Sequence, residues 1–496
     1  MQTVVIGAGF GGLAAALRTA ARGGKVTVVD RLPGPGGRGR EFVRSTDGQL
    51  FRYDAGPTVL TAPVLFEELF ALFGERLADH VELMPVTPWY QMRFSDSTQL
   101  NYGGSTEQIQ AEIAKFSAAD ALAYPAFLAH SQKLFEKGYE ELGSHAFLGW
   151  GSMLKALPAM MRLRADRSVY EVTARYFKDE RIRRAFSIQP LLVGGNPFDT
   201  TSIYSLIHYL ERKWGVWFPR GGMARLLDAL VALGQRHGVE YVWNADVLSI
   251  TSIDAKATGI QLQDGRELKA DVVISNADAG YTVAKLMPKN MQQPRQVAKK
   301  QYSMGLFVWY FSTKRVYADV PHHTILFGES YREVLHKIFE SQQLTDDLSI
   351  YLHRPSATDA QYAPAGYDSF YALVPVPNLG ADIDWTTKAA PFKALLQTEL
   401  TRRLLPGLAE SIVDEHFVTP QYFESELLSP LGSGFSITPK FTQSAGFRFP
   451  NRSPDLPNLY FVGAGTHPGA GVPGVVTSAK VVERLMFGGE IGRAHV

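Results

Sequence analysis

Short apolar runs that end in glycine or in an acidic residue recur along this chain. The first run, Thr3 to Ile6, and the second, Lys25 to Val29, have the β-branched composition of buried strands. An alanine-rich stretch with the composition of a helix lies between them. Glycines separate the first strand from this helix, and Asp30 follows the second strand. The pattern therefore predicts a strand, a glycine turn, a helix and a second strand, as at the start of an α/β fold.

A second group of strand-like runs lies between residues 239 and 278. The Asp264-Gly265 pair between two of these runs is typical of a hairpin turn. The runs are Glu240 to Val242, Val247 to Ile253, Gly259 to Leu262 and Asp271 to Ile274. We expect the last run to join the first sheet as one more parallel strand. The first domain is then discontinuous in sequence.

Three further runs carry bulky side chains on both faces. They are Leu306 to Phe311, Leu348 to Leu352 and Ser369 to Val374. A sheet that is apolar on both faces must be covered on both faces. Helices could form one cover and a long apolar ligand the other, or helices could cover both. The runs predict a second, mixed-sheet domain, but they do not decide what covers each face of its sheet.

Bulky apolar residues alternate with basic residues between positions 147 and 167. The apolar members are Phe147, Leu148, Trp150, Met153, Leu154, Leu157, Met160 and Met161, and the basic members are Lys155, Arg162, Arg164 and Arg167. This pattern suits an interfacial helix that enters the headgroup layer without spanning the bilayer. Amphipathic helices also pack against protein cores, so both interpretations stay open.

The bulk properties narrow the class of protein. A chain of 496 residues is too long for one compact core, so two or three subdomains are expected. A net charge of +1 disfavours nucleic-acid binding. The absence of cysteine excludes disulfides and thiolate metal sites and fits a reducing, cytosolic location. No apolar run approaches the roughly 20 residues that span a bilayer, and residues 490 to 496 resemble a translated adapter, a non-native tail.

The glycines after the first strand carry the first candidate chemistry. Gly7 permits a sharp turn, Gly9 leaves room for a pyrophosphate, and Gly12 lets the helix lie close to the sheet. The amino end of that helix offers free N–H groups and a favourable dipole. Asp30 follows Gly12 by about 18 residues, near the spacing at which an acid accepts hydrogen bonds from an adenosine ribose. These positions predict a site for an adenine dinucleotide.

Further glycine-rich segments favour FAD over NAD. Residues 31 to 38 form a basic loop where a nicotinamide enzyme usually continues into a helix. Residues 459 to 474 form another strand that ends in glycines, with a helix from about Val475, but without a GxGxxG spacing or a following acid. We expect this segment and the turn at residues 53 to 60 to approach the rest of one FAD. The candidate cofactor-binding residues are Gly7, Gly9, Phe10, Gly11, Gly12, Asp30, Arg31, Gly36, Gly37, Arg38, Gly56, Pro57, Thr58, Val247, Asn276, Gly463, Gly465, Gly471 and Val472.

Several motifs, taken in order, resemble those of the bacterial-type phytoene desaturases. They cover nearly the whole chain, up to about Met486: Gly7 to Gly12, Pro35 to Arg38, Asp54 to Thr58, Leu192 to Pro197, Trp217 to Gly222 and Gly463 to Gly474. Only the stretch between the second and third motifs is longer than expected. The resemblance implies a flavoprotein of the amine-oxidase-like superfamily. Its fold class would be α/β, with a discontinuous Rossmann-type FAD-binding domain, a mixed-sheet substrate domain and a helical membrane-associating region.

The resemblance also implies a domain division and an activity. The FAD-binding domain would comprise residues 1–85, 230–290 and 453–489, the substrate domain residues 86–140 and 291–452, and the helical region residues 141–229. The expected reaction is stepwise desaturation of 15-cis-phytoene towards all-trans-lycopene by hydride transfer to flavin. The expected partners are phytoene and partly desaturated carotenoids, a membrane lipid surface, and a quinone or oxygen as electron acceptor. The enzyme would sit peripherally on the cytoplasmic face of the membrane.

Candidate catalytic side chains are few. The sequence offers no nucleophile with a paired base, and the adjacent His322 and His323 would point apart in an extended strand, so no metal site is expected. Arg167 and Arg448 lie in stretches that resemble the family, although a surface or salt-bridge arginine is the better single interpretation of each. His467 lies beside the predicted flavin loop and could contact the ring or only stabilise the loop. The acceptor of the second proton is left open between a carboxylate, water and the flavin environment.

Three alternative functions remain. The first is another carotenoid flavoenzyme, such as a C30 or hydroxycarotenoid desaturase or an isomerase. The second is a flavin-free lipid-binding protein on the same scaffold, as in the inhibitors that carry prenylated GTPases; the intact glycines and Asp30 argue against it. The third is an amine oxidase, whose cationic substrate would favour an aromatic cage.

Overall fold

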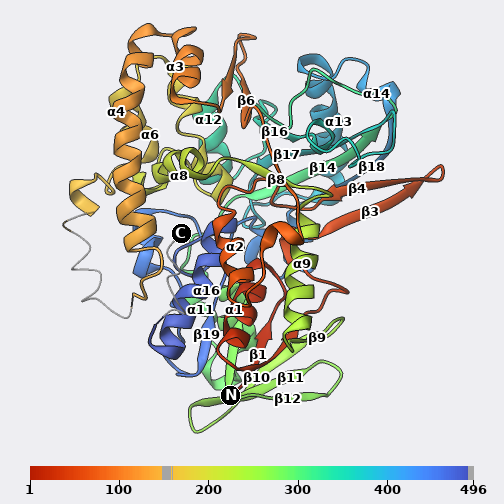
Figure 1. Ribbon diagram of the computed structural model, residues 1–496. Coiled ribbons are helices and arrows are strands. Elements are labelled where there is room, and N and C mark those ends of the chain that lie inside the picture. The colour runs from red at the N-terminus through yellow and green to blue at the C-terminus, as the bar shows by residue number, and fades with distance from the viewer. Residues whose placement is uncertain (148–157, 159, 490–496) are drawn as a thin grey trace.

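A five-stranded parallel sheet forms the base of the molecule in the computed structural model, which describes residues 1–147, 158 and 160–489 (Figure 1). The strand order is β19 (Leu459–Phe461), β13 (Val272–Ser275), β1 (Gln2–Ile6), β2 (Lys25–Val29) and β9 (Glu240–Val242). These strands come from the beginning, the middle and the end of the chain. The predicted discontinuous α/β domain is therefore confirmed.

The two faces of this sheet have different covers. Val5 and Ile274 pack against a layer of helices, which are α1 (Phe10–Ala21), α2 (Val64–Ala71), α9 (Met223–Arg236) and α16 (Val472–Phe487). Val4 and Val273 face the opposite side, where a three-stranded antiparallel sheet is formed by β10 (Val247–Ile253), β11 (Lys256–Leu262) and β12 (Glu267–Lys269). The predicted hairpin turn joins β11 to β12. Helix α16 begins three residues before the predicted start near Val475.

A seven-stranded mixed sheet forms the second part of the molecule. Its order is β18 (Ile412–Val418), β14 (Gly305–Thr313), β17 (Asp368–Val376), β16 (Ile350–His353), β15 (His323–Leu326), β6 (Tyr90–Arg93) and β7 (Gln99–Tyr102). Neighbouring strands are antiparallel except for the parallel pair β15 and β6. The mixed-sheet domain predicted from the bulky runs is confirmed.

Alternation along β17 divides the two faces of this second sheet. Phe370, Ala372 and Val374 pack in the core that also contains helix α13 (Trp385–Arg403). Tyr371 and Leu373 point to the other face, where they border a large cavity. The structure therefore favours the arrangement with a helix on one face and an apolar cavity on the other.

A group of helices closes the side of the molecule next to this sheet (Figure 1). It comprises α3 (Thr106–Ala114), α4 (Ala118–Phe135), α6 (Val169–Tyr176), α7 (Glu180–Ala185), α8 (Leu206–Trp214) and α12 (Tyr331–His336), and aromatic side chains such as Phe127 and Phe186 fill its core. Short helices elsewhere are α10 (Ala279–Tyr281), α11 (Pro294–Ala298), α14 (Leu408–Ser411) and α15 (Pro420–Ser425). Within the described parts of the chain, no helix has the length and apolarity that crossing a membrane requires. Most of the predicted membrane-contacting segment, residues 148–157 and 159, and the predicted non-native tail lie outside the described residues.

The stretch that is longer than the family pattern forms a projecting hairpin (Figure 1). Its strands are β3 (Glu41–Thr46) and β4 (Gln49–Asp54), joined at Asp47 and Gly48, which both have positive φ. This is the geometry of the tight turn that suits twisted hairpin strands. The Tyr53 hydroxyl donates to Asp414 of β18 at 3.0 Å and fixes the base of the hairpin. A smaller antiparallel pair is formed by β5 (Leu83–Pro85) and β8 (Trp217–Pro219).

Candidate active site

A large cavity joins the carboxyl ends of the parallel strands to the inner face of the seven-stranded sheet. It contains about 3320 Å³ of empty space, including solvent at its mouth. One end is bordered by the turn after β1, the loop at residues 36–39 and the loop before α16. The other end is bordered by α8 and by strands β14 to β17. The same cavity thus reaches the predicted cofactor loops and the apolar sheet.

The side chain of Asn276 lies at the centre of the glycine-rich end. A Cβ atom added to Gly9 would lie 2.8 Å from Asn276 Oδ1, and one added to Gly11 would lie 2.9 Å from Nδ2. A Cβ atom on Gly463, in the distant loop after β19, would also lie 2.8 Å from Nδ2. The three glycines therefore let three segments of the chain converge on the Asn276 side chain, and the space left by the missing side chains opens into the cavity. Such a cradle fits a dinucleotide pyrophosphate.

Two helices begin at this cradle, and the first backbone N–H groups of a helix have no partner within the helix itself. Gly9 is the residue before α1 and Gly471 is the residue before α16, and neither helix start is capped by a side chain. Both glycines line the cavity. Helix N-termini of this kind attract phosphate through their free N–H groups and their dipole.

Asp30 is held in place at the end of β2. Its Oδ2 atom accepts a hydrogen bond from Ala8 N at 2.7 Å, and Oδ1 accepts one from Leu32 N at 2.9 Å. Burial raises the pKa of Asp30, opposed by these backbone hydrogen bonds and by Arg31. Each carboxylate oxygen keeps further acceptor capacity, so the group can still accept a hydrogen bond from a ribose hydroxyl.

The second glycine loop packs directly against the turn after β4. A Cβ atom on Gly56 would lie 2.2 Å from the carbonyl oxygen of Arg38, so only glycine allows this contact. The Arg38 Nε donates to the carbonyl oxygen of Gly434 at 2.9 Å. Burial lowers the pKa of Arg38, and nearby Asp278 opposes this effect. A bound anion would further stabilise the arginine charge.

The structure brings nearly all of the predicted cofactor residues to one cavity. Every member of the predicted set except Gly12 lines it, including Val247 and Asn276 from the middle of the sequence. Gly12 instead faces the turn, because a Cβ atom there would lie 2.0 Å from the carbonyl oxygen of Gly7. Gly12 therefore allows helix α1 to lie close to strand β1, as its position in the motif predicts.

The far end of the cavity is apolar on two sides. Helix α8 contributes Leu206, Ile207 and Leu210, which lie on one face of the helix. The sheet contributes mainly apolar and aromatic side chains from four neighbouring strands, which include Leu306, Ile325, Tyr351, Tyr371, Leu373 and Pro375. A slot between a helix and a sheet suits a long, flat hydrocarbon.

Two of the three predicted catalytic residues lie away from the cavity wall. Arg167 is on the surface with 52 % of its side chain exposed, and it lies 3.4 Å from Asp166 and 3.8 Å from Glu171. Arg448 is buried and donates from Nε to the carbonyl oxygen of Thr466 at 2.9 Å. It therefore stabilises the loop before α16. A catalytic part for either arginine stays a prediction.

His467 lines the cavity beside the loop before α16. Its Nε2 lies 2.9 Å from the carbonyl oxygen of Leu142, and its buried Nδ1 has no hydrogen-bond partner among the described residues. Burial lowers the pKa of His467 to about 4. The ring is thus neutral near pH 7, and it can offer or accept a hydrogen bond but does not supply a charge.

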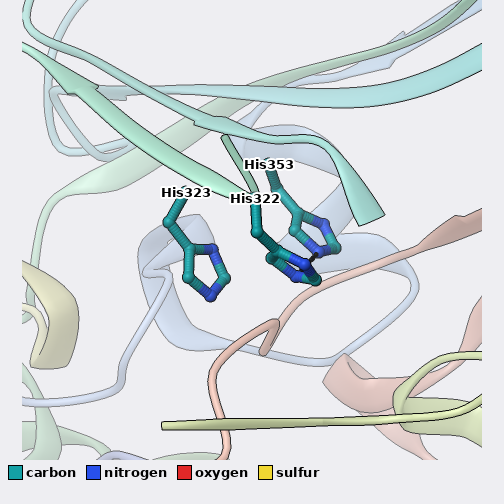
Figure 2. A group of neighbouring side chains, drawn as sticks. All are labelled: His322, His323 and His353. Atoms are coloured by element: carbon teal, nitrogen blue, oxygen red, sulfur yellow. Dashed lines mark hydrogen bonds between the residues drawn. The ribbon is translucent and has the colours of Figure 1, made fainter. Parts of the chain in front are cut away.

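The prediction that His322 and His323 point apart is wrong (Figure 2). Their ring centroids lie 4.4 Å apart, and His353 of the neighbouring strand joins them. The reason is that His322 precedes β15, so strict strand alternation does not apply to the pair, while register pairs His323 with His353. Nε2 of His322 lies 2.9 Å from Nε2 of His353, which makes a hydrogen bond between neutral rings.

This histidine cluster has ligand atoms within 4.8 Å of one another. A metal ion between them would replace the hydrogen bond from His322 to His353. Burial lowers the pKa of all three rings, and the charge of Arg354 further lowers that of His322. A divalent charge would therefore be buried beside a cation, with no carboxylate in hydrogen-bond contact with the rings in the described part of the chain. The absence of a metal site stays our prediction.

Sequence reasoning missed Glu211, which lines the apolar end of the cavity. Its side chain is buried, and the Tyr90 hydroxyl donates to Oε1 at 2.9 Å. Glu211 shares the apolar face of α8 with Ile207 and Leu210, at helical spacing. The signal available in the sequence was a carboxylate placed among the apolar residues of one helix face.

Comparisons with known proteins agree with this geometry. The family model for flavin-containing amine oxidoreductases matches residues 10–482. The chain is 45 % identical to the lycopene-forming phytoene desaturase of Pseudescherichia vulneris, covering 98 % of this chain and 99 % of that protein. It is also 45 % identical to the neurosporene-forming phytoene desaturase of Rhodobacter capsulatus, covering 98 % and 94 %. An oxidoreductase structure from Methanosarcina mazei covers 97 % of this chain and 99 % of its own, with a TM-score of 0.62 at 17 % identity, a likeness of fold.

Proposed function

Because this chain belongs to the flavin-containing amine oxidoreductase family, and within it to the bacterial-type phytoene desaturases, we propose that it desaturates phytoene stepwise towards lycopene. The cofactor is FAD. The observation that carries the proposal is the continuous cavity, which leads from the glycine cradle around Asn276 to the apolar slot between α8 and the sheet. A redox cofactor and a hydrocarbon can therefore meet in one cavity.

The chain contributes position and exclusion of water to this reaction. Bound FAD supplies the hydride acceptor. The sheet wall around Tyr371 and Leu373 and the helix wall around Ile207 and Leu210 hold an extended polyene by apolar contact. Removal of hydride from an allylic carbon leaves a delocalised cation, which water would attack. An apolar, water-poor slot protects that cation until a proton is lost.

The extent of desaturation is part of the proposal. The relatives in which lycopene and neurosporene are the named products share the same 45 % identity with this chain. We favour lycopene because another lycopene-forming enzyme, from Pantoea ananas, is 44 % identical over 98 % of the chain. A C30 or hydroxylated carotenoid as substrate is the remaining alternative.

We further propose that the enzyme takes its substrate from a membrane as a peripheral protein on the cytoplasmic face. Phytoene is insoluble in water, so it must enter the cavity from a lipid phase. Support comes from Phe147 and Met160, two described residues of the basic and apolar segment, because both line the cavity. We propose a quinone of that membrane, or oxygen, as the electron acceptor.

The decisive experiment is incubation of the purified protein with FAD and phytoene-loaded liposomes. The products are separated by their number of conjugated double bonds, which reports both the reaction and its extent. Products with up to 11 conjugated bonds, the number in lycopene, are expected. Unchanged phytoene would refute the proposal, and a protein that never retains FAD would favour the flavin-free lipid-binding alternative.

A further inference from the structure

Glu211 differs from the other carboxylates on the cavity wall. Among the wall residues that the structure describes, the remaining acids are Asp30, Asp246, Asp278 and Glu426, and all lie near the dinucleotide loops. Asp30 accepts backbone hydrogen bonds, Asp246 pairs with Arg31 at 2.8 Å, and Asp278 accepts from Gly280 N at 2.8 Å. Glu211 is the acid of the apolar end.

The carboxylate of Glu211 is only half satisfied. The residue is 1 % exposed, and Tyr90 donates to Oε1, whereas Oε2 has no hydrogen-bond partner among the described residues. The neighbouring Arg212 guanidinium stacks 4.8 Å from the ring of Trp89, and no ion pair joins it to Glu211 in the described structure. A buried carboxylate with one oxygen left without a hydrogen bond costs stability, so its place on a reaction cavity points to chemistry.

We propose that Glu211 is the catalytic base that accepts the proton released in each desaturation step. This inference rests on the proposed function. One carbon of the polyene gives up a hydride, with both bonding electrons, to the bound flavin. A C–H bond on the adjacent carbon then breaks, its electron pair forms the new C=C bond, and the proton bonds to Oε2 of Glu211. The carboxylate becomes a neutral carboxylic acid, and the substrate cation becomes a neutral alkene.

The environment of Glu211 suits this exchange. Burial raises its pKa to about 7, although the hydroxyl groups of Tyr90 and Tyr102 and the charge of Arg212 oppose the rise. A base with this pKa is partly ionised near neutral pH and binds a proton readily. Tyr90 is a positioning residue, because its hydrogen bond to Oε1 leaves Oε2 directed away from that donor.

The test compares Glu211→Gln and Glu211→Asp with the wild type in the liposome assay between pH 5.5 and 8.5. A general base contributes about 10²- to 10⁴-fold, so kcat of Glu211→Gln should fall by at least about 100-fold with FAD content unchanged. The wild-type kcat should rise with pH through about 7. This rise of kcat with pH, the acidic limb of the pH profile, should disappear in Glu211→Gln. Glu211→Asp should recover part of the rate. The matched control is Glu41→Gln, which removes another carboxyl that is 7 % exposed and whose pKa is raised by burial. Glu41 does not line the cavity, so this variant should keep the rise of kcat with pH.

A second readout does not depend on carotenoid turnover. The raised pKa of Glu211 means that wild-type stability is lost as pH rises through about 7, whereas Gln at this position is neutral at every pH. The melting temperature of Glu211→Gln relative to wild type should therefore increase from pH 5 to pH 8.5. Full activity in Glu211→Gln, an intact limb, or a pH-independent difference in melting temperature would each overturn the assignment. An inactive wild type would instead refute the proposed function.

Discussion

The substitution Gly9→Ala separates cofactor binding from folding. Gly9 has φ −74° and ψ 175°, a backbone conformation open to any residue, so alanine introduces no backbone strain. Its Cβ atom would lie 2.8 Å from Asn276 Oδ1, the end of a side chain that can move. We expect a change in the free energy of unfolding within about 1 kcal/mol, because Gly→Ala also stabilises by about 0.4–1 kcal/mol through the unfolded chain.

The effect on FAD should be much larger. The added methyl group would lie where the pyrophosphate approaches the start of α1, and at least one hydrogen bond from a backbone N–H to phosphate would be lost. A hydrogen bond to a charged group contributes about 1.5–3 kcal/mol, which corresponds to roughly 10- to 150-fold weaker binding. The measurement is an FAD titration of apoprotein, with flavin absorbance after gel filtration as a second readout.

Gly34→Ala is the matched control for this experiment. It makes the same chemical change in the neighbouring loop, but no atom lies within 4 Å of its added Cβ atom, and Gly34 does not line the cavity. This variant should bind FAD as the wild type does. If Gly9→Ala also bound FAD with wild-type affinity while remaining folded, the pyrophosphate would not lie at Gly9, and the cradle around Asn276 would need another occupant.

Three further changes test other parts of the structure. Gly12→Ala places a Cβ atom 2.0 Å from the carbonyl oxygen of Gly7, so the yield of folded protein and the melting temperature should both fall; a wild-type melting curve would contradict the packing described for α1. Burial raises the pKa of Asp54 from 3.8 to about 7, so wild-type stability should decrease as pH rises towards about 7. In chemical unfolding, Asp54→Asn should remove up to roughly 3 kcal/mol of the loss between pH 5 and pH 8. Leu373→Asp puts a charge on the sheet wall of the cavity and should lower the rate of desaturation at least about 10-fold with FAD content unchanged. Its control is Leu122→Asp, at a residue of α4 that is 80 % exposed, which should leave the rate and the FAD content unchanged.

The cofactor end of the site could be predicted because its requirements are local. Gly7, Gly9 and Gly12 act within one turn of the chain, and Asp30 ends the next strand, so spacing alone carries the geometry. The place of Asn276 could also be predicted, because the run from Asp271 to Ile274 was expected to join the first sheet as a parallel strand, and β13 does lie beside β1. The contacts of three glycines with its side chain could not be predicted, because they depend on the packing of the distant loop after β19.

The apolar end could be predicted only in outline. Bulky runs indicated a sheet covered on both faces, but the choice between a helix and a cavity depends on which tertiary elements pack there. Strand alternation also failed at His322, because this residue stands before β15 and its partner His353 comes from a different strand. Glu211 was not predicted for a similar reason, because its hydrogen-bond partner, Tyr90 of β6, is distant in the sequence. Local sequence patterns predict the helices and strands, whereas contacts between residues that are distant in the sequence determine the chemistry of the site.

The same scaffold occurs in a cyclohexylamine oxidase from Brevibacterium oxydans, with a TM-score of 0.60 at 15 % identity. A shared fold does not carry a shared substrate, so specificity must come from the side chains that face the cavity. In this chain those side chains are Leu306, Ile325 and Leu373 on the sheet and Ile207 on α8, which offer no charge to bind an amine. Glu211 could in principle attract a cation, but a permanent positive charge in the slot would have to be desolvated. The carbocation of a desaturation step differs because its charge arises inside the slot and disappears there with the loss of a proton. A buried carboxylate that alternates between charged and neutral forms is suited to that short-lived charge.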